Sequence, residues 1–86
     1  MRVVVPSQLY SYTGGQRAVS AEGATLAEAL ADLDRQFPGL RFRVIDEQDR
    51  VRRHIVIFVG GVRQDELETP LAPDAEVQIV GALSGG

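Results

Sequence analysis

Residues 25–39, TLAEALADLDRQFPG, decide the fold of this chain. Thr25 and Glu28 fit a capping box, in which the Thr oxygen accepts from an early helix N–H and the Glu carboxylate accepts from the cap N–H. Pro38-Gly39 is a typical helix end. The sequence therefore predicts an amphipathic helix from about Leu26 to Gln36. Its apolar side chains, spaced by three and four, are Leu26, Ala29, Leu30, Leu33 and Phe37.

Two segments that read as strands precede this helix, the first of them β-branched and apolar. Arg2–Val5 ends at Pro6, and Gln16–Ser20 follows the turn signal Thr13–Gly15. We expect the two segments to pair as an N-terminal hairpin, with Val19 facing inward.

The region after the helix contains one ambiguous segment and two clear strands. Leu40–Val51 reads either as a helical turn or as a ragged strand, and it contains a polar turn at Asp46–Asp49. His54–Val59 is the clearest strand, and Gly60-Gly61 is a hairpin turn into Val62. Val77–Leu83 is predicted to be the last strand.

The order strand, strand, helix, strand, strand predicts an α+β roll, in which one sheet packs on one main helix. With 86 residues, the chain has room for a single core. We expect residues 1–83 to form that domain and residues 84–86 to form a flexible Gly-Gly tail.

Composition excludes several classes of site. The chain has no Cys, which removes disulfides, thiol nucleophiles and zinc-thiolate sites, and His54 is its only His. No metal site and no bound cofactor are expected. A net charge of −3 disfavours nucleic-acid binding, and the apolar run Val3–Val5 is too short for a membrane span or a signal peptide. We expect a cytoplasmic protein.

Strand alternation predicts an apolar face that the single helix cannot cover. If Ile57 and Ile79 face the helix, their neighbours face the other way, where an apolar patch marks a partner site. The predicted partner-binding residues are Val56, Phe58, Val80 and Ala82, with Val4 beside them. The alternative is that Leu40–Arg53 folds over this face.

A basic cluster lies at Arg50–His54. Such a cluster is commonly a solvated surface. The alternative is a docking patch for an acidic partner surface.

The C-terminus, Ser84-Gly85-Gly86, ends in two glycines. Residues without a Cβ let a terminal carboxylate pass through a channel that side chains would block, and Ser84 is nearly as slim. The Gly86 carboxylate can attack the α-phosphate of ATP when a partner supplies Mg²⁺ and positive charge. The alternative is an idle, frayed end.

These features together resemble the ThiS/MoaD family of ubiquitin-like sulfur carriers, and most of all its longer, CysO-like members. The likeness spans essentially the whole chain. The segments that carry it are Thr13–Gln16, Thr25-Leu26, Phe37–Arg41, Arg53–Val59, Thr69–Leu71 and Gly85-Gly86.

The resemblance implies a β-grasp fold with a mixed sheet. It also implies a carrier rather than an enzyme, whose Gly86 is adenylated by an E1-like enzyme using ATP-Mg and converted to a thiocarboxylate. The length of Leu40–Arg53 favours a cysteine-synthase-like, PLP-dependent acceptor enzyme, with a metalloprotease that releases the product.

Three alternatives stay open: the small subunit of a molybdopterin-synthase-like complex, a protein modifier conjugated through Gly86, and a structural β-grasp domain with an idle tail. The chain also departs from the family pattern at one place. Such carriers often have Pro and Ala shortly before the glycine pair, where this chain has Gly81–Ser84. This leaves the identity of the partner open.

Overall fold

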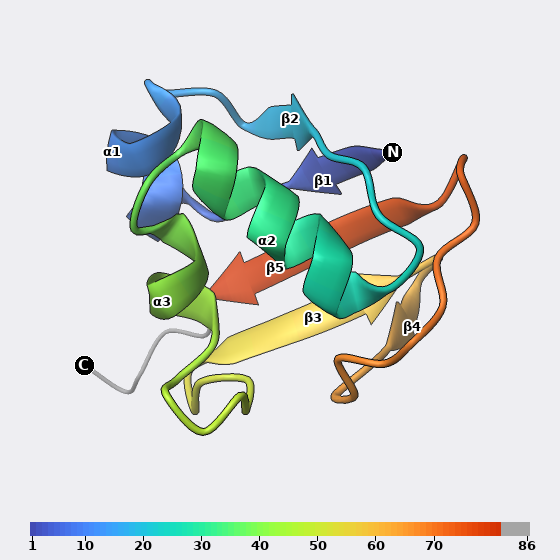
Figure 1. Cartoon of the computed structure of the whole chain (residues 1–86). Coiled ribbons are helices and arrows are strands. Elements are labelled where there is room, and N and C mark those ends of the chain that lie inside the picture. Colours follow the sequence, from blue (N-terminus) through green and yellow to red (C-terminus); the bar gives the residue numbers. More distant parts are fainter. Residues whose placement is uncertain (82–86) are drawn as a thin grey trace.

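A computed structural model of the chain describes residues 1–81, in which one main helix, α2 (Leu26–Gln36), lies across one face of a mixed sheet (Figure 1). The sheet order is β2-β1-β5-β3-β4, with β1 and β5 parallel in the middle and the other pairs antiparallel. This is the β-grasp arrangement that was predicted. The strands are β1 (Arg2–Val4), β2 (Ala18–Ser20), β3 (Ile55–Val59), β4 (Val62–Arg63) and β5 (Glu76–Gly81).

The main helix has the bounds that the sequence predicted. The Thr25 hydroxyl accepts from the Glu28 N–H at 3.2 Å, as a capping box requires. The other half of the box is wrong by one residue, since the Glu28 carboxylate accepts from the N–H of Ala24 at 3.0 Å and not from that of Thr25. The N–H groups of Leu26 and Ala27 donate to the carbonyls of Thr69 and Leu67, which lie in the loop between β4 and β5.

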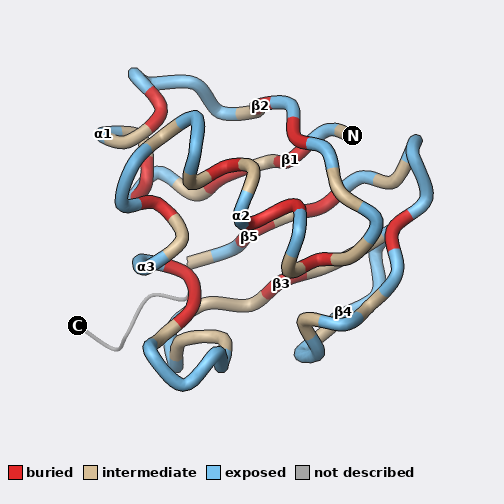
Figure 2. The backbone as a smooth tube through the Cα atoms, viewed as in Figure 1, coloured by how far each residue is buried: buried red, intermediate tan, exposed pale blue. Residues whose placement is uncertain are grey.

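The core lies between α2 and the sheet face that it covers (Figure 2). Apolar residues from both elements are fully or almost fully buried there, and Phe37 at the end of the helix is half-buried. Val19 is buried, as predicted. The central buried side chains are Val3, Val5, Val19, Leu26, Leu30, Leu33, Ile57, Val77 and Ile79.

The connection between β1 and β2 is not a simple turn. β1 and β2 pair as predicted, but β2 begins at Ala18 rather than at Gln16, and two short helices, η1 (Ser7–Leu9) and α1 (Tyr10–Thr13), separate the strands. The reason is burial: Leu9 is 2% exposed and Thr13 is 1% exposed, and the Thr13 hydroxyl donates to the carbonyl of Gln16 at 2.8 Å. A helix of one turn leaves no periodic pattern in the sequence.

The ambiguous segment uses both of its predicted conformations in turn. α3 (Leu40–Val44) is a short helix, and Ile45 then forms an isolated bridge with Val51. The turn between them is held by Asp46, whose carboxylate accepts from the N–H groups of Arg50 and Gln48. These bonds, the one from Arg50 first, lower the pKa of Asp46.

The predicted turn Gly60-Gly61 joins β3 to β4 with φ angles of 57° and 83°. Positive φ at both positions defines the tight hairpin turn that glycine adopts without strain. β3 begins at Ile55, one residue after the predicted start. The last strand, predicted from 77 to 83, is described from Glu76 to Gly81.

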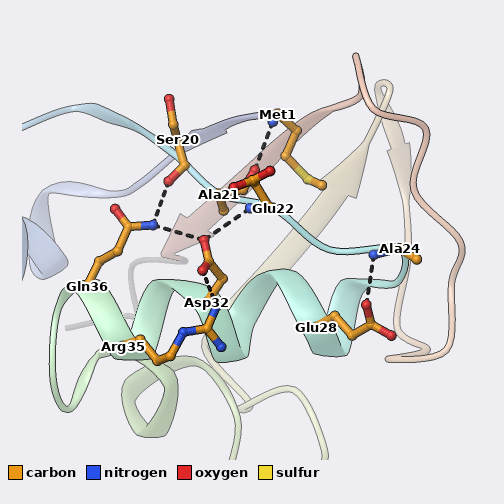
Figure 3. Close-up of polar contacts among 9 residues, drawn as sticks. All are labelled: Met1, Ser20, Ala21, Glu22, Ala24, Glu28, Asp32, Arg35 and Gln36. Carbon is orange, nitrogen blue, oxygen red and sulfur yellow. Dashed lines mark hydrogen bonds and ion pairs between the residues drawn. The ribbon is translucent and has the colours of Figure 1, made fainter.

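A polar clamp on the exposed edge of α2 joins the helix to the end of β2 (Figure 3). The Asp32 carboxylate accepts from the backbone N–H of Glu22 at 3.1 Å and from the Gln36 amide at 3.0 Å, and it pairs with Arg35. The Gln36 amide also donates to the carbonyl of Ser20 at 2.8 Å. The bond from the Glu22 N–H is the main cause of a lowered pKa at Asp32.

Candidate functional site

The sheet face that points away from α2, which we call the open face, carries apolar side chains outside the core. Val56 and Phe58 are half-buried, as is Val4, and Val80 is 42% exposed. Their neighbours Ile57 and Ile79 are buried, so the strands alternate as predicted.

The ambiguous segment does not use its apolar side chains to cover this face. Leu40, Val44 and Ile45 are fully buried in the same core cluster as the residues of α2. The alternative, in which Leu40–Arg53 shields the open face, is therefore wrong for these side chains. Val56, Phe58 and Val80 remain on a surface that another protein can cover.

The strand register divides the open face into an apolar end and a charged end. Val56 is directly opposite Val80, while Arg2 is directly opposite Glu76 at the other end of the sheet. The Arg2 and Glu76 side chains approach to 3.8 Å across this pair. Between the two ends lies one row of paired residues across three strands. In this row Gln78 of β5 lies between Phe58 of β3 and Val4 of β1.

The apolar end is next to the point where the described chain ends. Gly81 closes β5 and pairs with Ile55, one step along from the Val56–Val80 pair. The amide of Gln8 lies against Gly81, so that a Cβ at this position would be 2.4 Å from Gln8 Nε2. A larger residue at position 81 would have to displace that amide. We call Gly81 with the flanking Ile55 and Gln8 the tail root.

The predicted site residues divide into two groups. Val56, Phe58 and Val80 lie together on one face of neighbouring strands. Their role in partner binding stays a prediction. The other predicted site residues lie outside the described residues: Ala82, Ser84, Gly85 and Gly86.

Two residues of the tail root were not predicted. Gly81 carries a signal that could have revealed it, because a glycine inside a β-branched strand marks a close approach of another group. Gln8 carries none, because only the folded chain brings η1 next to the end of β5. In the described part of the chain, none of the helices has the length and apolar character that a membrane crossing needs.

Comparison with known families and proteins finds relatives over the whole chain. The model of the ThiS family matches residues 3–86, a range that reaches the last glycine. The proteins named sulfur carrier protein CysO from Mycobacterium bovis and Mycobacterium tuberculosis are each 35% identical to this chain. Each alignment extends over 89 positions and covers 98% of this chain and 96% of the relative.

Solved structures of CysO proteins are also similar to this chain. A chain of the Amycolatopsis orientalis BexX/CysO complex superposes with a TM-score of 0.90 at 28% identity, covering 99% of this chain and 98% of its own length. CysO of M. tuberculosis, described as an antigen, gives 0.89 at 31% identity, with 95% and 98% covered. SAMP1 from Haloferax volcanii gives 0.78 at 27% identity, with 100% and 98% covered.

Proposed function

The chain belongs to the ThiS family, and from this premise we propose that it is a sulfur carrier protein whose working group is the carboxylate of Gly86. The observation that carries the proposal is that the family match continues to residue 86, where the chain ends in Gly85-Gly86. The 35% identity to proteins named sulfur carrier protein CysO supports the same role. In this role the chain is a co-substrate of other enzymes rather than a catalyst.

The proposed chemistry has two steps at the Gly86 carboxyl group, the first at its oxygen and the second at its carbon. The Gly86 carboxylate attacks the α-phosphate of ATP, pyrophosphate leaves, and an acyl-adenylate forms. Hydrosulfide, or a donor equivalent to it, then attacks the acyl carbon. A C–S bond forms, the bond to AMP breaks, and the C-terminus becomes a thiocarboxylate. An E1-like enzyme supplies the ATP-Mg site, and because ATP is needed we place the reaction in the cytoplasm.

The open face explains how a partner could hold the carrier during these steps. Its apolar end, with Val56 opposite Val80, lies next to the tail root. An enzyme that covers Val56, Phe58 and Val80 would therefore also receive the residues that follow Gly81. We propose that Ala82 extends this contact and that Ser84 and Gly85 pass through a channel too narrow for larger side chains.

For the acceptor, we propose a cysteine-synthase-like, PLP-dependent enzyme. The support is the similarity to CysO proteins over 98% of this chain. The thiocarboxylate sulfur would form a C–S bond to the β-carbon of the amino-acid substrate held by that enzyme, after the leaving group on that carbon has departed. The new cysteine would stay joined to Gly86 until a metalloprotease hydrolyses the bond between them and returns the Gly86 carboxylate. The structure of a BexX/CysO complex supports docking of CysO-like proteins on other proteins.

A second candidate function is protein modification through Gly86. The similarity to SAMP1, a small archaeal modifier protein, favours it, at 27% identity over the full chain. Both functions use the same adenylate and differ only in the nucleophile that follows. A sulfur nucleophile gives the carrier, whereas a lysine amine gives a conjugate.

The test is an intact-mass measurement after incubation with the E1-like enzyme of the same organism, ATP-Mg and a sulfur donor. We expect one oxygen-to-sulfur exchange, which peptide mapping assigns to the C-terminal peptide. Adding a candidate acceptor enzyme with its substrate should then give a cysteinyl adduct on Gly86. An isopeptide bond to lysine in place of both products would support the modifier instead.

Deletion of Gly85-Gly86 separates chemistry from folding. Because the deletion leaves the core between α2 and the sheet intact, the free energy of unfolding should change by less than about 0.5 kcal/mol, as for a surface substitution. Thiocarboxylate formation should be abolished. Ser84→Ala, which keeps the glycine pair, is the matched control and should react like the wild type. A deletion variant that still gains sulfur would refute the assignment to Gly86.

A further inference from the structure

All nine basic residues of the chain are Arg, and seven of them fall into two kinds of environment. Four of them are within 4 Å of an acidic side chain: Arg2, Arg35, Arg41 and Arg63. Three others line a hollow of about 320 Å³, and within the described part of the chain no acidic residue lines it. We call this hollow the basic cleft, and its lining is Gln8, Leu9, Arg43, Arg52, Arg53, His54 and Ile55.

Three segments far apart in the sequence build the basic cleft. η1 supplies one wall, α3 supplies Arg43, and the residues leading into β3 supply Arg52 and Arg53. Arg52 is held in place, since its Nε donates to the Phe42 carbonyl at 2.6 Å and its guanidinium carbon lies 4.5 Å from the centre of the Phe42 ring. Arg43 and Arg53 are exposed beside it and can reach a partner.

A second, larger hollow in the described part of the chain has a different character. It measures about 610 Å³ and is lined by both signs of charge. Arg41 and Asp49 pair at 3.1 Å there, and Arg63 and Asp65 pair at 3.4 Å, so these charges already have partners within the chain. Of these two hollows in the described part of the chain, the basic cleft is the one that presents several cations with no anion in its lining.

The basic cleft shares two residues with the tail root. Ile55 pairs with Gly81 in the sheet, and the Gln8 amide lies against Gly81. A protein that receives the residues after Gly81 therefore faces the cleft at the same time. The whole chain has a net charge of −3, so its overall charge would repel an acidic partner, and any attraction must come from this local surface.

We propose that the basic cleft is a docking site for acidic side chains of the enzyme that holds the C-terminal tail. This inference rests on the proposed carrier function. Arg is suited to the role because its guanidinium takes a carboxylate in two parallel hydrogen bonds. The exposure of Arg43, Arg53 and His54 favours a protein surface over a small enclosed ligand. This contact fixes the orientation in which the enzyme binds, and it therefore fixes the direction in which the C-terminal tail enters the enzyme.

The test compares two variants that change net charge equally. Arg43→Gln with Arg53→Gln removes two charges from the cleft. Arg17→Glu makes the same change in net charge at an exposed position outside the lining of the cleft. The dissociation constant for the E1-like enzyme that thiocarboxylates the wild type is measured for each by calorimetry, at low and high salt.

We expect the double variant to bind about 10-fold more weakly at about 50 mM salt, and its deficit to shrink to about 2-fold at about 500 mM salt. Arg17→Glu should stay within about 2-fold of the wild type at both salt concentrations. Arg53→Glu should also bind weakly. If an Asp→Arg or Glu→Arg substitution in the enzyme restores its binding to Arg53→Glu, the substituted residue is the one that pairs with Arg53.

Two results would overturn the docking proposal while leaving the carrier function intact. One is equal binding by the double variant and Arg17→Glu, with wild-type thiocarboxylate still formed. The other is saturable binding of sodium pyrophosphate at the cleft, seen as NMR shifts at Arg43 and Arg53, without any effect of the double variant on the enzyme. If the wild type itself gains no sulfur from its E1-like enzyme, the carrier function fails first, and that assay shows it directly.

Discussion

The two faces of the sheet are made by alternate residues of the same strands, yet they differ in almost every physical respect. On one face Ile57 is fully buried under α2, while on the other its neighbours Val56 and Phe58 are only half-buried. Residue type does not explain this difference, because Val56 and Phe58 are as apolar as Ile57. One helix can cover only one face, so a chain of this size must leave the other to water or to a partner.

The covered face is also fastened by polar groups at its edge. Asp32 and Gln36 join α2 to the β2 end of the sheet, and the loop at Leu67–Thr69 caps the start of α2. The covered face therefore contains the core of the fold, and we propose that the other face is left for binding. Three substitutions test this division between the two faces.

The largest effect should come from the covered face. Ile57→Ala removes buried methyl and methylene groups at a fully enclosed position, so we expect a loss of about 3 kcal/mol in the free energy of unfolding. Val80→Ala, on the open face, should cost less than about 1 kcal/mol. Urea titration followed by circular dichroism measures both. Equal losses would show that the two faces do not differ in their contribution to stability.

A smaller effect, on binding rather than folding, is expected from Phe58→Asp. The half-buried ring lies on the open face beside Gln78, and a charge there should weaken binding to the E1-like or acceptor enzyme by about 2 kcal/mol. The variant should remain a folded monomer, which circular dichroism and size-exclusion chromatography check. Gln78→Asp places the same charge in the same row without removing an aromatic ring, and it serves as the control. Unfolding of Phe58→Asp would mean that the ring belongs to the core.

The smallest effect concerns pH and the clamp on α2. The pKa of Asp32 is lowered, chiefly by the Glu22 N–H, so its ionised form is favoured in the folded state. The resulting stabilisation is present above the unfolded pKa of about 3.9 and is lost as pH falls through the lower folded value. Asp32→Asn should therefore lose less stability than the wild type when pH falls from about 5 to about 2.

Melting temperatures across this pH range provide the measurement. Asp74→Asn removes an exposed acid from the loop before β5 and is the charge-matched control. If Asp32→Asn and Asp74→Asn showed the same pH dependence, the clamp would not hold the covered face.

Local signals predicted much of the fold. The bounds of α2 follow from Thr25 and from the spacing of Leu26, Leu30 and Leu33, because the hydrogen bonds within a helix join residues only four positions apart. The turn at Gly60-Gly61 was equally local. The short helices between β1 and β2 were missed because their residues are held by burial at Leu9 and Thr13, which no local pattern records.

The candidate site divides in the same way. Alternation placed Val56, Phe58 and Val80 on one face, since a strand turns successive side chains to opposite sides. The tail root and the basic cleft were not predictable, because they join η1, α3 and β3 at the end of β5. The Arg50–His54 cluster was visible in the sequence, but only the fold shows that Arg52, Arg53 and His54 share the cleft with Arg43.

The main helix and the alternation of the strands can be read from the sequence, because each depends on neighbours within a few positions, and the glycine pair at the end is itself sequence. Which strands lie side by side, and which groups surround Gly81, follow only from the folded chain. The parallel pairing of β1 with β5 joins residues more than seventy positions apart, such as Arg2 and Glu76. Such a contact gains its free energy from a core assembled by the whole chain, and that core is not encoded in any single segment.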